Sequence, residues 1–284
     1  MIGTNQEGYS PLIGHPQKGV IMHFTKMHGL GNDYLYVYGE VPANVAELSR
    51  RLSDRHFGVG SDGMIYISPS SVADFKMRIF NADGSEALMC GNGIRCVGKY
   101  VYDKGLTSKN ALRIETLSGI KDVGLTLLDG RVDRATVGMG VAQARGELEL
   151  KVGSATVCGI PVSVGNPHFV IFVDDAQAAP VDTLGPTIER HEAFPDGVNV
   201  EFAQVLARDE IRMRVWERGS GVTMACGTGA CATAVAAVTQ GKCPYGRPIA
   251  IHLDGGDLHI RVSTDGAVTM TGPATTVYEG DIEI

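Results

Sequence analysis

Two cysteines stand in a context that could do chemistry. Cys90 and Cys226 each come directly before a Gly-x-Gly triplet, in Cys-Gly-Asn-Gly and Cys-Gly-Thr-Gly. A helical pattern follows in both places, so each cysteine is predicted to lie where a loop becomes a helix. The first N–H groups of a helix are unpaired and its dipole is positive there, so we expect a stabilised anion and a lowered pKa for each thiol. The glycines let a ligand approach the backbone closely.

The chemistry that such a pair would perform is proton transfer at carbon. Two helix starts that face one another across a two-fold would hold one carboxylate between them and place one sulfur on each face of the adjacent carbon. A thiolate on one face would remove a proton and a thiol on the other face would return one, which inverts a stereocentre.

Other interpretations of the cysteines are less well supported. A zinc site is disfavoured because Cys90-x5-Cys96 and Cys226-x4-Cys231 lack the usual C-x2-4-C spacing. A phosphatase-type Cys-x5-Arg loop fails because Arg95 comes one residue early, and no G-x-G-x-x-G follows a strand. Free cysteine is usually a core residue, and we expect that for the remaining four: Cys96, Cys158, Cys231 and Cys243.

Both cysteines belong to an internal repeat. Met77–Gly93 (MRIFNADGSEALMCGNG) aligns without a gap to Met213–Gly229 (MRVWERGSGVTMACGTG), 136 positions later. Upstream, LGNDYLYV from Leu30 matches VGNPHFVI from Val164 at an offset of 134. Two echoes in the same order indicate a duplicated domain, and 284 residues suit two domains.

The repeat sets the expected domains. We predict a polar N-terminal extension over 1–21 with Met22 as an alternative start, a first domain over 22–140 and a second over 141–273. The last strand, about 274–284, is expected to return to the first domain.

The elements that must position the cysteines are strands, with two kinds of helix. Surface helices are predicted over 44–58, capped by Asn44, and over 181–197. The stretch 94–105 is predicted to be a short helix, and 227–241 a helix that is apolar all round and therefore enclosed. The alternating segments between them are predicted strands, with a hairpin turn at Asp129-Gly130. The simplest fold is a sheet wrapped around one helix in each domain.

Composition limits the partners and the compartment. The net charge is −7 and no dense Lys/Arg block occurs, so nucleic acid is not an expected partner. No apolar run reaches the roughly 18–20 residues that cross a membrane, and residues 1–21 lack the pattern of a signal peptide. Six cysteines in a chain of this kind predict free thiols in a reducing compartment, the cytoplasm.

From about Met22 onward, the sequence resembles the diaminopimelate epimerase family. The motifs that carry the resemblance are HGLGNDY (28–34), FNADGSEALMCGNGIRC (80–96), VGNPH (164–168), GVNVEF (197–202) and WERGSGVTMACGTGACA (216–232). The resemblance implies an α+β fold of two pseudo-symmetric domains, each a curved, largely antiparallel sheet around a central helix. It also implies a homodimeric isomerase without cofactor or metal. Such an enzyme converts LL-2,6-diaminoheptanedioate to the meso form in lysine and cell-wall precursor synthesis.

The same resemblance assigns roles to residues. Cys90 and Cys226 become the two acid/base groups. The helix starts bind the carboxylate at the reacting carbon through Gly91, Asn92, Gly227 and Thr228. The remaining groups of the diamino diacid are held by Asn32, Asn81, Asn166, Asn199, Glu217 and Arg218. Arg218 suits the distant carboxylate and Glu217 an ammonium group. His168 and Glu217 are expected to help set the protonation of the second cysteine.

Some alternatives remain open at this point. Each asparagine is otherwise a turn residue, as Asn32 and Asn166 beside glycine would be, and His168 is otherwise structural. Part of the family has a substrate-contacting glutamine where this sequence has Gly63. The competing functions are a proline or hydroxyproline racemase-like enzyme, which would not need the residues for a far carboxylate, and a thiol redox protein.

Overall fold

The computed structural model describes residues 20–284. The predicted extension over 1–21 therefore lies almost entirely outside the described residues, and the first strand begins at Ile21.

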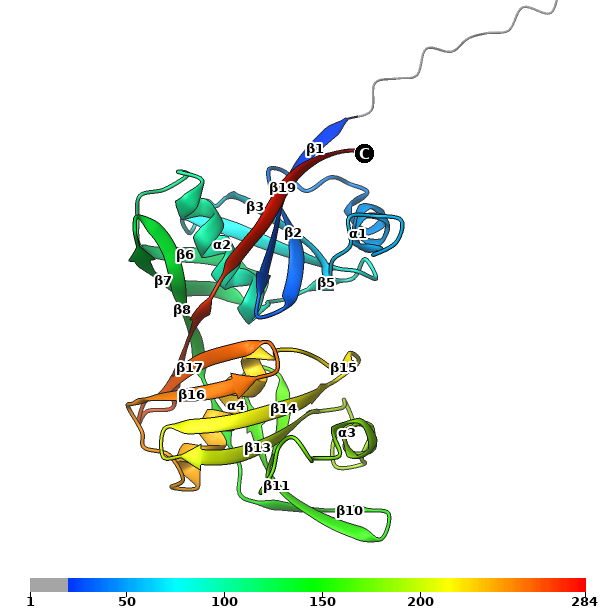
Figure 1. The fold of residues 1–284 in the computed structure, drawn as a ribbon, viewed down its shortest axis with the longest axis vertical. Coiled ribbons are helices and arrows are strands. Elements are labelled where there is room, and N and C mark those ends of the chain that lie inside the picture. The colour runs from blue at the N-terminus through cyan, green and yellow to red at the C-terminus, as the bar shows by residue number, and fades with distance from the viewer. Residues whose placement is uncertain (1–19) are drawn as a thin grey trace, which may run out of the picture.

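The first half of the chain forms a curved sheet around one helix (Figure 1). Its elements are β1 (Ile21–Gly29), β2 (Asn32–Tyr38), α1 (Val45–Ser53), β3 (Gly63–Pro69), β4 (Phe75–Asn81), β5 (Glu86–Ala87), α2 (Gly91–Asp103), β6 (Ala111–Thr116), β7 (Gly119–Leu128) and β8 (Arg131–Val141). The strand pairs are antiparallel except for β2–β3 and β4–β6, which are parallel.

The second half repeats this arrangement. Its elements are β9 (Gln143–Ala144), β10 (Leu148–Val152), β11 (Ala155–Ser163), β12 (Pro167–Phe172), α3 (Val181–Glu189), β13 (Asn199–Ala207), β14 (Glu210–Glu217), β15 (Gly221–Val222), α4 (Gly227–Thr239), β16 (Pro248–Leu253), β17 (Gly256–Val262) and β18 (Ala267–Pro273). The parallel pairs are β12–β13 and β14–β16, at the matching places. The predicted fold of two pseudo-symmetric α+β halves is confirmed.

The two central helices are enclosed by strands. α4 buries all of its 13 residues except Thr228 and Thr239, because nearly all its side chains are small and apolar. α2 also has 13 residues and is largely buried, but it carries Arg95 at the position that matches Cys231. The sequence-based prediction of an enclosed helix after each cysteine is therefore correct.

Two segments connect the halves. β8 runs from one half into the other and pairs antiparallel with β18, with Val137 opposite Met270. The last strand, β19 (Thr275–Glu283), returns to lie beside β1, from Ile21 opposite Glu283 to His28 opposite Thr275 (Figure 1). The domain boundaries at 140 and 273 stay a prediction.

The surface helices are shorter than predicted. α1 ends at Ser53, not near Gly58, because the Asp54 carboxylate accepts hydrogen bonds from the N–H groups of His56 and Phe57 at 2.7 and 2.8 Å. Such a local turn competes with the helix. Asn44 occupies the N-cap position but makes no side-chain cap hydrogen bond.

None of the four helices within residues 20–284 combines the length and apolar character that crossing a bilayer requires.

One cysteine prediction is wrong. Cys96, Cys231 and Cys243 are buried, but Cys158 is exposed. It lies on β11 where that strand pairs with β10 in a hairpin, opposite Glu149. The sequence pattern did not predict β10.

Gly63, at the start of β3, has no room for a side chain. Its φ of +153° is one that other residues rarely adopt, and a Cβ there would lie 2.2 Å from the carbonyl oxygen of Phe80. A side-chain contact from this position to a ligand is therefore excluded in this backbone.

We expect Gly63→Ala to lower the free energy of unfolding by about 2 kcal/mol or more, because the clash and the backbone strain add. Gly138→Ala is the matched control, since its Cβ would meet nothing closer than 3.8 Å and its φ is ordinary. It should change stability by less than about 0.5 kcal/mol in urea titrations. Equal effects of the two variants would contradict this account of Gly63.

Candidate active site

Each candidate cysteine is the N-cap of a central helix. Cys90 precedes α2 with extended backbone angles, and its Sγ accepts a hydrogen bond from the N–H of Gly93 at 3.3 Å. Cys226 precedes α4 in the same way, and its Sγ accepts from the N–H of Gly229 at 3.3 Å. Each sulfur thus takes the place of the side-chain oxygen that usually caps a helix.

The two helix starts lie against one another. Asn92, in the first turn of α2, donates a hydrogen bond from Nδ2 to the carbonyl of Ala225 at 3.1 Å. Ala225 directly precedes Cys226. A Cβ on Gly227 would lie 3.6 Å from Oδ1 of Asn92. The fold therefore brings the two cysteine loops into contact.

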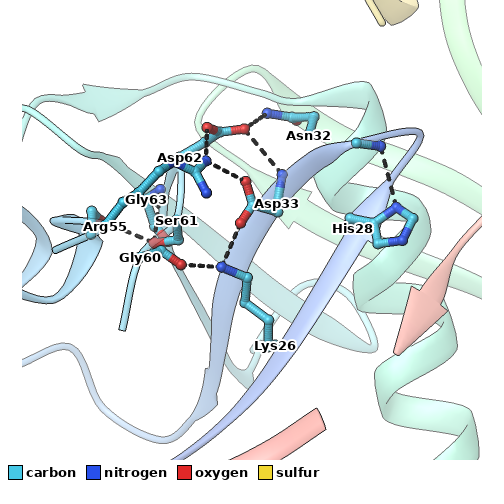
Figure 2. A network of polar contacts seen from close by, with 11 residues as sticks. Lys26, His28, Asn32, Asp33, Arg55, Gly60, Ser61, Asp62 and Gly63 are labelled. Atoms are coloured by element: carbon cyan, nitrogen blue, oxygen red, sulfur yellow. Dashed lines mark hydrogen bonds and ion pairs between the residues drawn. The ribbon is translucent and has the colours of Figure 1, made fainter. Parts of the chain in front are cut away.

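A polar network joins β1, β2 and the segment between α1 and β3 (Figure 2), and its residue Asn32 contacts Cys90. Oδ1 of Asn32 lies 3.4 Å from the Cys90 sulfur, and its Nδ2 donates to Asp62 at 2.8 Å. Asp62 also accepts from the backbone N–H of Asp33 at 3.0 Å. Arg55 bridges the two carboxylates, at 2.8 Å from Asp33 and 3.0 Å from Asp62. Asp62, itself bound by Arg55, thus holds the Asn32 side chain next to Cys90.

A different network leads to Cys226. The hydroxyl of Thr228 lies 3.6 Å from the sulfur and accepts from Nδ2 of Asn166 at 3.2 Å. Oδ1 of Asn166 lies 3.0 Å from Nε2 of His168, and Nδ1 of His168 lies 2.6 Å from Glu201. His168 and Glu201 are both fully buried. His168 therefore belongs to the site, and reaches the cysteine through Asn166 and Thr228.

The residues predicted for the far end of a ligand are held mainly by protein groups. Oδ1 of Asn199 accepts from the N–H of Arg218 at 2.9 Å, and its Nδ2 donates to the carbonyl of Pro167 at 2.9 Å. The Arg218 guanidinium donates to the carbonyl of Asp196 at 2.7 Å. Nδ2 of Asn81 donates to the hydroxyl of Ser85 at 3.1 Å. Asn199 therefore positions the backbone of Arg218.

Glu217 is the carboxylate that faces the second cysteine. Its carboxylate accepts a hydrogen bond from the hydroxyl of Thr223, and its negative charge acts on Cys226. Burial raises the pKa of its carboxyl group, and the hydrogen bond from Thr223 opposes the rise. In the described part of the chain, no group of three or more His, Cys, Asp or Glu side chains is arranged to hold a metal ion.

The expected lowering of the thiol pKa values is wrong for this structure. Burial raises the pKa of Cys90, although the N–H groups of Gly93 and Asn92 and the charge of Arg95 oppose the rise. Burial raises the pKa of Cys226 well above its ordinary value, and the negative charges of Glu217 and Glu201 add to the effect. The helix start is present at each sulfur, but loss of solvent outweighs it.

Three charged residues of the site are given no role from the sequence, although two of them lie within its motifs. Glu201 lies on β13 where the first half has Ile65 on β3, so the repeat contained a signal: one apolar position had become acidic. Asp62 comes just before Gly63, in a stretch that reads only as a glycine-rich turn. Arg95 stands out in the sequence only as a mismatch to a phosphatase loop.

Comparison with known proteins gives consistent matches over most of the chain. The family model described as Diaminopimelate epimerase matches residues 24–144 and 160–277. A protein named Diaminopimelate epimerase from Phocaeicola vulgatus is 51% identical over 276 residues, which covers 92% of this chain and 98% of that protein. One from Parabacteroides distasonis is 52% identical over 268 residues, covering 93% and 98%.

Solved structures share the fold at low identity. A PhzF-family phenazine biosynthesis protein from Bacillus anthracis has a TM-score of 0.77 at 16% identity, covering 93% of this chain and all of that one. A hydroxyproline epimerase from Agrobacterium vitis has a TM-score of 0.68 at 18% identity, covering 93% of each chain. At these identities the likeness shows the fold alone.

The raised pKa values predict how the thiols titrate in the ligand-free protein. Alkylation by iodoacetamide requires the thiolate, so its rate at Cys90 and Cys226 should still be rising at pH 9, and Cys226 should need the higher pH. Peptide mass spectrometry resolves the two sites, with exposed Cys158 as the accessible reference. Rates at Cys90 and Cys226 that level off below pH 8 would show that the helix starts outweigh burial.

Proposed function

This chain belongs to the diaminopimelate epimerase family, and we propose that it interconverts LL- and meso-2,6-diaminoheptanedioate with Cys90 and Cys226 as the two acid/base groups. It is an isomerase that acts on a small molecule. The observation that supports the residue assignment is the pairing of two cysteine-capped helix starts, which the hydrogen bond from Asn92 to Ala225 joins.

The helix starts would bind the carboxylate next to the reacting carbon. The N–H groups of Gly91, Asn92, Gly227 and Thr228 belong to the first turns of α2 and α4 and are oriented along the helix axes. Negative charge that develops next to the carbon during proton removal would be stabilised by the same donors and dipoles. One pair of loops thus serves both binding and the transition state.

The proton transfer needs one thiolate and one thiol. The thiolate breaks the Cα–H bond and becomes a thiol, while the opposite S–H bond breaks and its proton forms the new Cα–H bond. The roles exchange when the direction reverses. Since burial raises both thiol pKa values, formation of the thiolate is coupled to ligand binding, which brings an ammonium group into the site. Glu217, whose negative charge acts on Cys226, would exchange a proton with it.

The far end of the substrate would be recognised by the second half. Arg218 offers a guanidinium for the distant carboxylate, with its backbone fixed by Asn199. Asn81 and the asparagines at the two cysteines supply amide groups that serve either charge. A proline racemase-like activity, the alternative, leaves this set without a role.

We propose that the active species is a cytoplasmic homodimer that needs no metal or cofactor. Activity should survive dialysis against a chelator and treatment with hydroxylamine, and the active fraction should sediment as a dimer. Loss of activity that zinc or pyridoxal phosphate restores would overturn the cofactor proposal, and an active monomer would overturn the dimer.

The assignment of one cysteine to each face predicts distinct variants. Cys90→Ala and Cys226→Ala should each lower epimerisation by roughly 10²–10⁴-fold or more, because each removes one of the two proton-transfer groups. Any remaining exchange of the α-hydrogen in D2O should affect opposite stereoisomers in the two variants, measured by NMR on LL- and meso-substrate. Cys158→Ala, at an exposed cysteine, is the matched control and should keep wild-type turnover.

Two results would contradict the assignment. One is exchange of the same stereoisomer by both variants, which would place both sulfurs on one face. The other is near-normal epimerisation by either variant. Proline serves as the substrate control, because racemisation of proline at a comparable rate would favour the alternative function.

A further inference from the structure

We propose that Asp62 is a positioning residue for Cys90: it fixes the amide of Asn32 so that the amide oxygen, not the amide nitrogen, faces the sulfur. This inference rests on the proposed role of Cys90. It adds a carboxylate that the sequence analysis did not single out. It also explains why the amide oxygen of Asn32, and not its amide nitrogen, faces the sulfur of Cys90.

The chemistry of the groups permits one orientation. An amide offers donors at Nδ2 and an acceptor at Oδ1, whereas an ionised carboxylate only accepts. Nδ2 of Asn32 donates to Oδ2 of Asp62 at 2.8 Å, which leaves Oδ1 at 3.4 Å from the Cys90 sulfur. A turned amide would place two acceptors against each other at Asp62. The carboxylate therefore selects the face that Asn32 presents.

Asp62 is itself held firmly in place (Figure 2). Its Oδ2 also accepts from the backbone N–H of Asp33 at 3.0 Å, and its Oδ1 accepts from Arg55 at 3.0 Å. Its backbone carbonyl accepts from the N–H of Ala82 at 2.9 Å. Arg55 also bonds Asp33, whose second oxygen pairs with Lys26. These donors, from two elements, hold the Asp62 side chain against Asn32.

The second half of the molecule lacks this device. The position that matches Asp62, 136 residues later, is the fully buried Val198. Asn166, the counterpart of Asn32, meets His168 and Thr228 instead. Asp62 is therefore not a general requirement of the repeat, and its contacts are specific to the cysteine of the first half.

The consequence is a bias in the protonation of Cys90. An acceptor oxygen beside the sulfur stabilises the S–H form and disfavours the thiolate, so the pKa of Cys90 is higher than it would be beside an amide N–H. Release of the amide from Asp62 would let Nδ2 turn toward the sulfur. That change would favour the thiolate and misplace Asn32 for catalysis.

The test is a double-mutant cycle of Asp62 and Asn32, in which the rate of alkylation of Cys90 is measured. Asp62→Ala should lower the apparent pKa of Cys90 and raise its iodoacetamide alkylation rate at pH 8 by about tenfold, a shift of about one pKa unit. Asn32→Ala should shift Cys90 in the same direction because the acceptor is gone. Asp62→Ala should add nothing further in the Asn32→Ala background, since Asp62 acts through that amide. Turnover of Asp62→Ala should fall by about tenfold or more.

Matched controls separate orientation from charge and from folding. Asp33→Asn removes a charge from the same network but leaves the contact between Asn32 and Asp62, so Cys90 should titrate as in the wild type. Cys226 should keep its own profile in every variant.

The proposal is overturned if Asp62→Ala leaves the Cys90 profile or turnover unchanged, or if its effect persists in the Asn32→Ala background. It is also overturned if Cys226 shifts equally. If Asp62→Ala does not fold, Asn32→Ala decides alone: a Cys90 rate that does not rise refutes the acceptor role. Alkylation does not depend on substrate, so this result is independent of whether the proposed epimerase activity is correct.

Discussion

The site depends on two helix starts that are enclosed together. A helix inside a wrapped sheet leaves its first N–H groups without backbone partners, in a region where water is scarce. The sulfurs of Cys90 and Cys226 each accept from the third N–H of their helix, and the loops meet through Asn92. The remaining donors belong to the first turns of these two helices, whose loops are in contact. A bound carboxylate would satisfy them, so the need to complete two buried helices and the need to bind an anion are met by the same geometry.

The backbone of the repeat is symmetric but its charges are not. The matched helices α2 and α4 have equal length and the same cap. Yet a buried carboxylate, Glu201, stands where the first half has Ile65, and a buried guanidinium, Arg95, stands where the second half has Cys231. Arg95 therefore acts on the first cysteine, Glu201 acts on the second, and Glu217 acts on both.

Local sequence was sufficient for the architecture and for the caps. The repeat can be read by aligning the sequence with itself. The Gly-x-Gly after each cysteine and the apolar 13-residue helix α4 are patterns of neighbouring residues, so the sequence alone reveals them. The errors concern properties that depend on long-range packing. Burial sets the direction of the thiol pKa values, and sequence does not report it. Cys158 has a core-like type but lies on an exposed hairpin, and α1 ends early because Asp54 captures two N–H groups. Glu201 and Asp62 could not be given roles from the sequence because their partners, His168 and Asn32, lie on other strands.

Arg95 is the charged residue that distinguishes the surroundings of Cys90 from those of Cys226. It is completely buried, and none of the ion pairs within residues 20–284 includes it. Its guanidinium donates to the carbonyls of Gly91 and Pro273 and to Oδ1 of Asn92, so it ties the first turn of α2 to the point where β18 leads into β19. A buried cation without a counter-charge is costly, and burial lowers its pKa accordingly. The same charge opposes the rise that burial causes in the pKa of Cys90. A negative charge formed at this site, as a thiolate or as a bound carboxylate, would therefore offset part of the cost of burying this guanidinium.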